Sequence, residues 1–307
     1  MRISRGVSLK KRTSLKIGGP ADYFVRVATE QELVRALKFA RLRKLKWYLI
    51  GAGSNLVAGD GGFSGLIIEN AIEKFARNNS EVSVGAGNNL LRLVYKLDRL
   101  GLGGLERMAG IPGTVGGAVY GSAGAYGQEI RERVAKVRYM DGKSNKFKWL
   151  SNRQCEFSYR HSIFKRKKHW IITEVRLKLT RGRGLARISD DIVKLRLKKY
   201  RKGLKCPGSF FKNIKLDELN KSERKILLSR VDRQKIIYGK VPVGYLLEEA
   251  GAKGLRQGSV RVARHHGNLI YNANGAKASD VKKLAKRLKV KVKKKFGIML
   301  EEEVQYL

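Results

Sequence analysis

The segment from residue 108 to residue 127 restricts the possible folds of this chain more than any other part of it. It carries no charged residue, and seven of its residues are glycine. Its length is that of a membrane span, and the spacing of Gly113, Gly117 and Gly121 is that of a contact between membrane helices. The sequence has no second candidate span, and so many glycines favour a loop whose backbone lies close to a ligand. We therefore expect a soluble protein without membrane insertion.

The charge of the chain is strongly positive. Its 307 residues include 67 Lys and Arg but only 26 Asp and Glu, which gives a formal net charge of +41. A chain so basic attracts polyanions. However, the cations are spread along the sequence, and the clusters at 165–168, 198–205 and 289–295 lack the repeated aromatic side chains of a single-strand binding surface. We interpret these clusters as solvated faces and do not expect nucleic-acid binding.

Two further features concern the compartment in which the protein works. Cys155 and Cys206 are far apart and form no CxxC pair, so we expect no disulfide framework. The first residues, Met-Arg-Ile-Ser-Arg-Gly, lack the apolar core of a signal peptide. Both features predict a cytoplasmic protein.

Hydrophobic patterns predict an α/β unit at the start of the chain. Residues 22–28 alternate as a strand does, Thr29 precedes the acidic first turn of a helix, and residues 47–50 form the next strand. Further strands are expected at 66–69, 82–85, 134–140, 171–179 and 266–271, and further helices at 89–100, 190–202 and 245–250.

The second half of the chain is predicted to form a separate domain. The pattern changes to a loop at 181–184, and we place the boundary there, between residues 1–183 and 184–307. A last helix starts at Ser279, with Val281, Leu284 and Leu288 on one face and lysines on the other. We expect the apolar face to pack in a core, because it is too narrow for binding to a membrane surface.

Two glycine-rich loops of the first half are candidates for phosphate binding. The first, Gly51-Ala-Gly-Ser-Asn55, follows a predicted strand, and its small residues let backbone N–H groups approach an anion. It is neither a GxGxxG nor a Walker A loop, and an ordinary turn is the alternative. The second, at 110–118, indicates backbone that lies flat against a flavin or, alternatively, a tight helix–sheet contact. Two such loops in one domain favour a dinucleotide, which has two phosphates to neutralise.

Seven stretches of the sequence, by their order and spacing, resemble the UDP-N-acetylenolpyruvoylglucosamine reductase (UDP-N-acetylmuramate dehydrogenase) family over nearly the whole chain. They lie at residues 13–22, 51–56, 109–118, 123–127, 159–162, 208–213 and 296–304, and include Tyr159-Arg-His-Ser162 and Gly208-Ser-Phe-Phe-Lys-Asn213. The resemblance implies an α+β protein. Its FAD-binding domain, of vanillyl-alcohol oxidase (PCMH) type in two α/β subdomains, would span residues 1–183, and a C-terminal α+β substrate-binding domain residues 184–307. The short link from Arg160 to Ser209 implies the short-loop (type II) subtype.

The resemblance also implies an activity. Members of this family reduce UDP-N-acetylglucosamine enolpyruvate to UDP-N-acetylmuramate with FAD and NADPH, in peptidoglycan synthesis. We expect the same oxidoreductase activity here, from a monomer. One alternative is an FAD-dependent oxidoreductase of the same fold with another substrate, and a second is a polyanion-binding protein with a vestigial flavin site. No residue can be assigned to a ribose 2′ position, so the choice between NADPH and NADH stays open.

Three residues match the catalytic positions of the family. Hydride addition to the enolpyruvyl double bond pushes negative charge into the carboxylate and requires a proton at the neighbouring carbon. Arg160 is implied to hold the carboxylate, for which a planar guanidinium is suited. Ser209 is implied to donate the proton. Glu303, in a run of three glutamates, is implied to stabilise the intermediate or to organise the proton relay.

The resemblance implies the remaining site residues as well. The cofactor-binding positions are Gly51, Ala52, Gly53, Ser54, Asn55, Leu56, Gly110, Ile111, Pro112, Gly113, Thr114, Gly116, Gly117, Ala118, Ser122 and Gly124. Tyr159, Lys212 and Asn213 are the candidate substrate contacts. The chain departs from the family pattern with Ser122 where Asn is frequent and Gln305 where Arg is common. No metal is expected, because the adjacent His265 and His266 point to opposite faces of a strand and no carboxylate or cysteine completes a ligand set.

Overall fold

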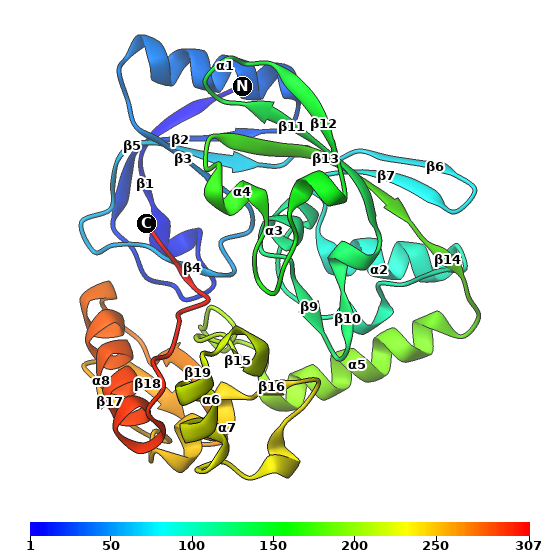
Figure 1. Ribbon diagram of the computed structural model, residues 1–307. Helices are drawn as coiled ribbons and strands as arrows, with labels where there is room; N and C mark the ends of the chain where they lie inside the picture. The colour runs from blue at the N-terminus through cyan, green and yellow to red at the C-terminus, as the bar shows by residue number, and fades with distance from the viewer. The chain divides into compact units, whose positions relative to one another are not determined.

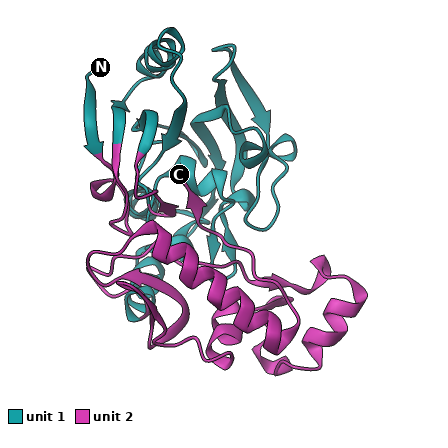
Figure 2. Cartoon of the chain, turned by 90° about the vertical axis from the view of Figure 1, so that its left-hand side faces the viewer, with its two compact units in different colours: residues 1–7, 21–53, 63–198 teal, residues 8–20, 54–62, 199–307 magenta.

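The computed structural model describes residues 1–307, and they form two compact units. Unit 1 comprises residues 1–7, 21–53 and 63–198, and unit 2 comprises residues 8–20, 54–62 and 199–307. Figure 2 shows the two units in teal and magenta. The last change of unit along the chain, at residues 198–199, therefore comes later than the predicted domain boundary at residues 183–184, and two short segments of the N-terminal part belong to unit 2.

Helix α5 (Leu185–Lys199) explains why the first unit extends beyond residue 183. It begins directly after Gly184, earlier than the predicted start at residue 190. Leu185 is buried, and Ile192 and Val193 pack against a core of unit 1. Because α5 packs on unit 1, the chain leaves that unit only at the end of the helix.

The first subdomain of unit 1 is a four-stranded sheet with one covering helix (Figure 1). Its strand order is β1 (Ile3–Ser8), β2 (Pro20–Val27), β5 (Phe63–Asn70) and β3 (Trp47–Ile50), and β5 pairs in parallel with both β2 and β3. Helix α1 (Glu30–Leu42) begins after Thr29, whose Oγ1 accepts a hydrogen bond from the N–H of Glu32 at 3.1 Å. Leu33 and Leu37 bury its inner face. The predicted strand–helix–strand start is confirmed.

The second subdomain of unit 1 is an antiparallel five-stranded sheet with helices packed against it. The strand order is β12 (Phe147–Ser151), β11 (Val134–Asp141), β13 (Trp170–Lys178), β7 (Glu81–Gly85) and β6 (Phe75–Asn78). The helices are α2 (Leu90–Arg99), α3 (Val115–Tyr120), α4 (Ile163–Arg166) and α5, and two short ribbons pair β8 (Leu102–Gly103) with β14 (Thr180–Arg181) and β9 (Gly124–Ala125) with β10 (Gln128–Glu129). Leu93, Val119 and Val175 belong to its core.

The glycine-rich segment 108–127 was predicted to be a loop. It is not a loop throughout, because it contains α3. The Oγ1 of Thr114 accepts a hydrogen bond from the N–H of Gly117 at 3.2 Å, which caps the first turn. Val115 and Val119 are fully buried and fix the helix against the core. The cap and the buried valines together outweigh the low helix propensity of glycine.

Unit 2 surrounds its own core with a three-stranded sheet and three helices. The sheet has the order β17 (Arg256–Gln257), β18 (Val260–Ala263) and β19 (His266–Asn272), and the helices are α6 (Lys221–Leu228), α7 (Val243–Glu249) and α8 (Ala278–Phe296). Two further pairs join β15 (Ile214–Lys215) to β16 (Lys240–Val241) and β4 (Leu56–Val57) to β20 (Gln305–Tyr306). In α8, Val281, Leu284 and Leu288 are fully buried, which confirms the predicted core face.

Short 3-10 turns complete the description of both units. They lie at Leu9–Lys11, Glu106–Met108, Ile130–Glu132, Arg153–Cys155, Leu216–Glu218 and Arg233–Lys235. None of the helices combines the length and the apolar character needed to cross a bilayer.

Candidate active site

The two glycine-rich loops predicted to bind the cofactor meet in unit 1. Gly51 directly follows β3, and a Cβ atom at this position would lie 2.6 Å from Thr114 Oγ1. That oxygen is the cap of α3. Gly116, in the same turn, packs as closely, since a Cβ there would lie 2.8 Å from the Cβ of Ala86. Glycine is therefore required at both positions by close approach, which leaves the backbone of both loops uncovered by side chains of their own.

Backbone conformation accounts for two more glycines of the predicted cofactor site. Gly110 has a φ of +76° and Gly113 a φ of +135°, both in the region that side chains rarely adopt. They flank Ile111 and Pro112, so that the chain turns sharply before α3. The carbonyl of Gly113 accepts a hydrogen bond from the N–H of Leu90 at 3.1 Å, which ties this turn to the start of α2.

The first loop continues from unit 1 into unit 2 between Gly53 and Ser54. In unit 2, the side-chain amide of Asn55 donates a hydrogen bond to the carbonyl of Glu303 at 3.0 Å, and the N–H of Gln305 donates to the carbonyl of Asn55 at 2.9 Å. Leu56 then pairs with Gln305 in the β4–β20 ribbon. Asn55, predicted as a cofactor contact, thus also fixes the C-terminal segment that carries Glu303.

Arg160 lies beside two predicted cofactor residues in unit 1. Its guanidinium donates hydrogen bonds to the carbonyl of Gly124 at 3.0 Å and to that of Ser122 at 3.4 Å. Tyr159 lies under the same guanidinium, with the ring centroid 5.2 Å from the Cζ atom. Arg160 has a φ of +56°, a strained conformation for this residue, and its carbonyl accepts a hydrogen bond from Lys165 Nζ at 2.7 Å. The orientation of Arg160 is therefore set by the fold of unit 1.

Ser122 provides a test of whether the residues present fit a bound flavin dinucleotide. Its side chain is fully buried, and its Oγ has no hydrogen-bond partner in the protein. A buried hydroxyl without a partner is costly, so Ser122 is a position at which a ligand would complete a hydrogen bond. Together with the close-packed Gly51 and Gly116, this orphaned oxygen fits a cofactor that lies on the 110–124 segment.

Ser209 lies in unit 2, in the turn before a buried pair of phenylalanines. Its Oγ is 3.0 Å from the hydroxyl of Tyr200 and 3.4 Å from the Nζ of Lys199. Phe210 and Phe211 follow and are almost completely buried. Their side chains anchor the turn in the core of unit 2, so that the position of Ser209 is determined by packing.

A buried asparagine holds the backbone next to Ser209. The Oδ1 of Asn268 accepts hydrogen bonds from the N–H of Phe210 at 3.2 Å and from that of Phe211 at 2.8 Å, and its amide donates to the carbonyl of Phe211 at 2.8 Å. Asn268 is 2% exposed, in the middle of β19. The sequence carried one signal for this role, an asparagine inside a predicted apolar strand, which requires buried partners.

The backbone of Glu303 is hydrogen-bonded to the residue that follows Ser209. Its N–H donates a hydrogen bond to the carbonyl of Phe210 at 2.8 Å. The two glutamates before it form ion pairs: Glu301 pairs with Lys212, and Glu302 Oε1 lies 2.5 Å from Lys289 Nζ.

The three predicted substrate contacts have structural partners of their own. The ammonium of Lys212 bonds to Glu301, and the ring of Tyr159 supports Arg160. The Oδ1 of Asn213 accepts a hydrogen bond from the N–H of Val243 at 3.1 Å and so caps the first turn of α7. Unit 2 thus brings together Ser209, Lys212, Asn213 and Glu303, while Tyr159 and Arg160 belong to unit 1.

His266 is a further, partly buried ionisable group near Lys199. Burial, and secondarily the charge of Lys199, lowers the pKa of His266 to about 4. Its Nδ1 accepts a hydrogen bond from the N–H of Asn268 at 3.1 Å, and its ring packs against Gly244, where a Cβ atom would lie 2.7 Å from Cε1. His266 is therefore a neutral, structural residue of unit 2 at neutral pH.

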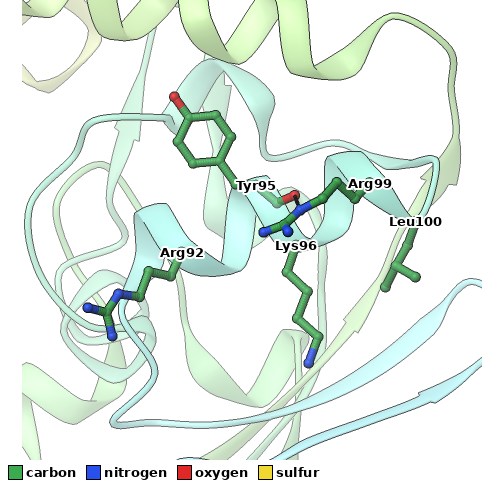
Figure 3. Close-up of a pocket in the computed structure, with 5 residues that line it drawn as sticks. All are labelled: Arg92, Tyr95, Lys96, Arg99 and Leu100. Carbon is green, nitrogen blue, oxygen red and sulfur yellow. Dashed lines mark hydrogen bonds between the residues drawn. The ribbon is translucent and has the colours of Figure 1, made fainter.

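A separate pocket of unit 1 lies along α2 and contains none of the predicted site residues. Its volume is about 510 Å³, and its lining consists of Arg92, Tyr95, Lys96, Arg99 and Leu100. Figure 3 shows the guanidinium of Arg99 turned back toward the carbonyl of Tyr95, to which its Nε donates a hydrogen bond at 3.2 Å. The Tyr95 hydroxyl bonds to Asp190 at 2.9 Å. The pocket is therefore a cationic surface feature apart from the predicted catalytic residues of unit 1.

Comparisons with known proteins agree with this description. The model of the UDP-N-acetylenolpyruvoylglucosamine reductase C-terminal domain matches residues 198–307, and that of an FAD binding domain matches residues 21–148. The UDP-N-acetylenolpyruvoylglucosamine reductase of Solibacter usitatus is 42% identical, over 100% of this chain and 97% of that protein. The Bacillus subtilis protein of the same name is 33% identical, over 97% of this chain and 92% of that protein.

A solved structure is similar along the whole length of the chain. The crystal structure of UDP-N-acetylenolpyruvylglucosamine reductase from Thermus caldophilus has a TM-score of 0.76 and 32% identity, and the match covers 100% of this chain and 99% of that one. The predicted fold class, an FAD-binding N-terminal part followed by an α+β C-terminal part, is confirmed. The chain belongs to the UDP-N-acetylenolpyruvoylglucosamine reductase family.

Proposed function

We propose that this protein reduces UDP-N-acetylglucosamine enolpyruvate to UDP-N-acetylmuramate, with FAD as cofactor and NADPH as hydride donor, in the synthesis of peptidoglycan precursors. Family membership along the whole chain supports the reaction. The observation that carries the proposal furthest is the short connection between Ser209 and Glu303. The N–H of Glu303 donates to the carbonyl of Phe210, the residue after Ser209, and a hydroxyl and a carboxylate are the types of group that this reduction needs.

The residues of unit 1 fit FAD. The backbone of the 51–53 and 110–118 segments would carry the dinucleotide, and the buried Ser122 hydroxyl would complete its hydrogen bond on it. FAD held by these segments would supply the chemistry of hydride transfer between the nicotinamide and the enolpyruvyl carbon. The protein's own contribution here would be to hold the ring system in position.

The chain's own side chains supply charge and a proton. Arg160, whose orientation is fixed by the carbonyls of Ser122 and Gly124, would hold the pyruvyl carboxylate and stabilise the negative charge that develops there. Ser209 would donate the proton to the neighbouring carbon; serine is a weak acid, but a carbanion-like carbon is a strong base. Glu303 would stabilise the intermediate or organise the proton relay. Residues 1–183 would bind the cofactor and residues 184–307 the nucleotide-sugar, with Lys212 and Asn213 among its contacts.

The test separates the two half-reactions under anaerobic conditions. NADPH should bleach the flavin absorbance of the loaded protein, and UDP-N-acetylglucosamine enolpyruvate should restore it with formation of UDP-N-acetylmuramate. Reduction by NADPH without reoxidation by this substrate would refute the proposal and point to another acceptor. The same assay with NADH decides the nucleotide preference. We further propose a cytoplasmic monomer, and the molar mass in solution tests the monomeric state.

A serine variant tests the assignment of the proton donor. Ser209→Ala should accept hydride from NADPH at the normal rate but reduce the nucleotide-sugar more slowly, by roughly 10²- to 10⁴-fold. Ser222→Ala, which removes an exposed hydroxyl of the same unit, is the matched control and should behave as the wild type. Normal turnover of Ser209→Ala would remove Ser209 from the mechanism.

A further inference from the structure

The hydroxyl of Ser209 has two polar neighbours that are adjacent in the sequence. Its Oγ lies 3.0 Å from the hydroxyl of Tyr200 and 3.4 Å from the ammonium of Lys199. The first distance is that of an ordinary hydrogen bond, whereas the second is at the limit of one. Tyr200 is therefore the principal partner of Ser209 within unit 2.

Both ends of this contact are held in place by neighbouring parts of unit 2. On one side, the Nε2 of His265 lies 2.9 Å from the carbonyl of Lys199 and fixes the chain next to Tyr200. On the other side, Asn268 fixes the N–H groups of Phe210 and Phe211, directly after Ser209. The contact between the two hydroxyls is therefore built into the fold, and is not a chance meeting of two mobile surface side chains.

The chemistry of the three groups indicates how the hydrogen bond is directed. An ammonium can only donate, so Lys199 turns its hydrogens toward Ser209 Oγ, and a hydroxyl has one hydrogen and two lone pairs. If Tyr200 also donates, both lone pairs of Ser209 are occupied and its single hydrogen is free to point at a substrate carbon. If Ser209 donated to the Tyr200 oxygen instead, its single hydrogen would be engaged there and would not point at the substrate.

We propose that Tyr200 is a positioning residue for Ser209, which orients the serine hydrogen toward the substrate and replaces it after transfer. This inference rests on the proposed function. As the Ser209 O–H bond breaks, the new C–H bond of the product forms. The Tyr200 O–H bond then breaks and restores the Ser209 O–H bond, since a phenol is a stronger acid than an alkyl alcohol. The phenolate, next to the Lys199 ammonium, takes up a proton from water.

Tyr200→Phe tests this role because it removes only the hydroxyl. Flavin reduction by NADPH should stay within about 2-fold of the wild type, and reduction of the nucleotide-sugar should slow by roughly 10- to 100-fold, with little change in KM. In D₂O that step should slow further in the variant than in the wild type, because proton transfer then limits the rate. Tyr238→Phe, which removes the hydroxyl of a tyrosine that is 78% exposed in the same unit, is the matched control.

A double-mutant cycle shows whether Tyr200 acts through Ser209. Adding Tyr200→Phe to Ser209→Ala should cause no further loss in the second half-reaction, because the group that Tyr200 positions is already absent. The inference would be overturned if Tyr200→Phe slowed the second half-reaction by the same factor in the wild type and in Ser209→Ala. A normal rate for Tyr200→Phe alone would also overturn it. If the wild-type protein itself fails to reduce the nucleotide-sugar, the proposed function fails instead, so the two failures are distinguishable.

Discussion

The backbone N–H of Glu303 donates a hydrogen bond to the carbonyl oxygen of Phe210 at 2.8 Å. Phe210 follows Ser209 directly, so this hydrogen bond connects the segments that carry two of the proposed catalytic residues of unit 2. A second backbone bond, from the N–H of Lys212 to the carbonyl of Glu301 at 2.9 Å, joins the same two segments. Asn268 holds the N–H of Phe210 from the other side. The relative position of Ser209 and Glu303 therefore depends on core contacts of unit 2, and changes in that core should affect stability and catalysis together.

Replacing Asn268 tests this dependence. Asn268→Ala removes three hydrogen bonds and leaves the N–H of Phe211 buried without its partner, while the N–H of Phe210 keeps its bond to the backbone carbonyl of residue 268. We expect the free energy of unfolding to fall by about 2–4 kcal/mol, measured by urea denaturation. Asn78→Ala, at an exposed strand position whose side chain forms no such network, should change it by about 0.5 kcal/mol or less. Equal stability of the two variants would contradict the role given to Asn268.

The close approach of Gly51 to Thr114 leads to a second prediction, on flavin binding. In Gly51→Ala the new methyl group would lie 2.6 Å from the oxygen that caps α3. Loss of the cap costs about 1 kcal/mol, and the displaced loop should hold less FAD. The ratio of flavin to protein absorbance after purification measures this, together with the melting temperature.

The control for this prediction is Gly61→Ala. A Cβ atom at Gly61 has no neighbour within 4 Å, and its φ is not in the left-handed region, so this variant should keep its flavin and its melting temperature. A Gly51→Ala protein with full flavin content would show that the contact between the two loops does not support the cofactor.

Local signals explain which parts of the fold could be predicted from the sequence. The cap at Thr29 and the spacing of Leu33 and Leu37 describe α1 completely, because they involve residues of one helix. The buried face of α8 was equally clear. The start of α5 was not, since this helix is held by Ile192 and Val193, which pack against a core formed by distant residues. The assignment of residues 8–20 and 54–62 to unit 2 has the same non-local origin.

The candidate site divides in the same way. The glycines of the two loops were predicted because a backbone that lies close to another group requires glycine, and glycine is visible in the sequence. The family motifs indicated Arg160, Ser209 and Glu303. Tyr200 was not predicted. Its contact with Ser209 depends on how the chain turns between the two residues. A tyrosine among lysines does not predict such a turn. The residues that position a reactive side chain are thus harder to predict from the sequence than the reactive residue itself.

The lowered pKa of His266 predicts a dependence of stability on pH. The pKa is about 4 in the folded protein and about 6.5 in an unfolded chain, so between these values the unfolded chain binds a proton that the folded protein does not. Stability from this residue is therefore complete above about pH 6.5 and is lost as the pH falls toward 4.

His266→Asn provides the comparison, because its amide oxygen can still accept from the N–H of Asn268 but does not titrate. Other groups titrate in both proteins alike. The wild type should lose about 1–3 kcal/mol more than the variant between pH 7 and pH 4, measured by urea denaturation at each pH. Parallel curves for the two proteins would show that His266 is not held in its neutral form.

The thiol of Cys155 should be unreactive in the native protein. The side chain is fully buried, and burial raises the pKa of Cys155 to about 12, so almost no thiolate exists at pH 8. A Cys206→Ser variant, which leaves Cys155 as the remaining thiol, should not react with a disulfide reagent until guanidinium chloride unfolds it, and should then release one equivalent of the chromophore. The reciprocal Cys155→Ser variant reports Cys206, which is 9% exposed, and should react faster. Rapid labelling of native Cys206→Ser would show that the core around Cys155 opens readily, since the thiolate is the reactive form.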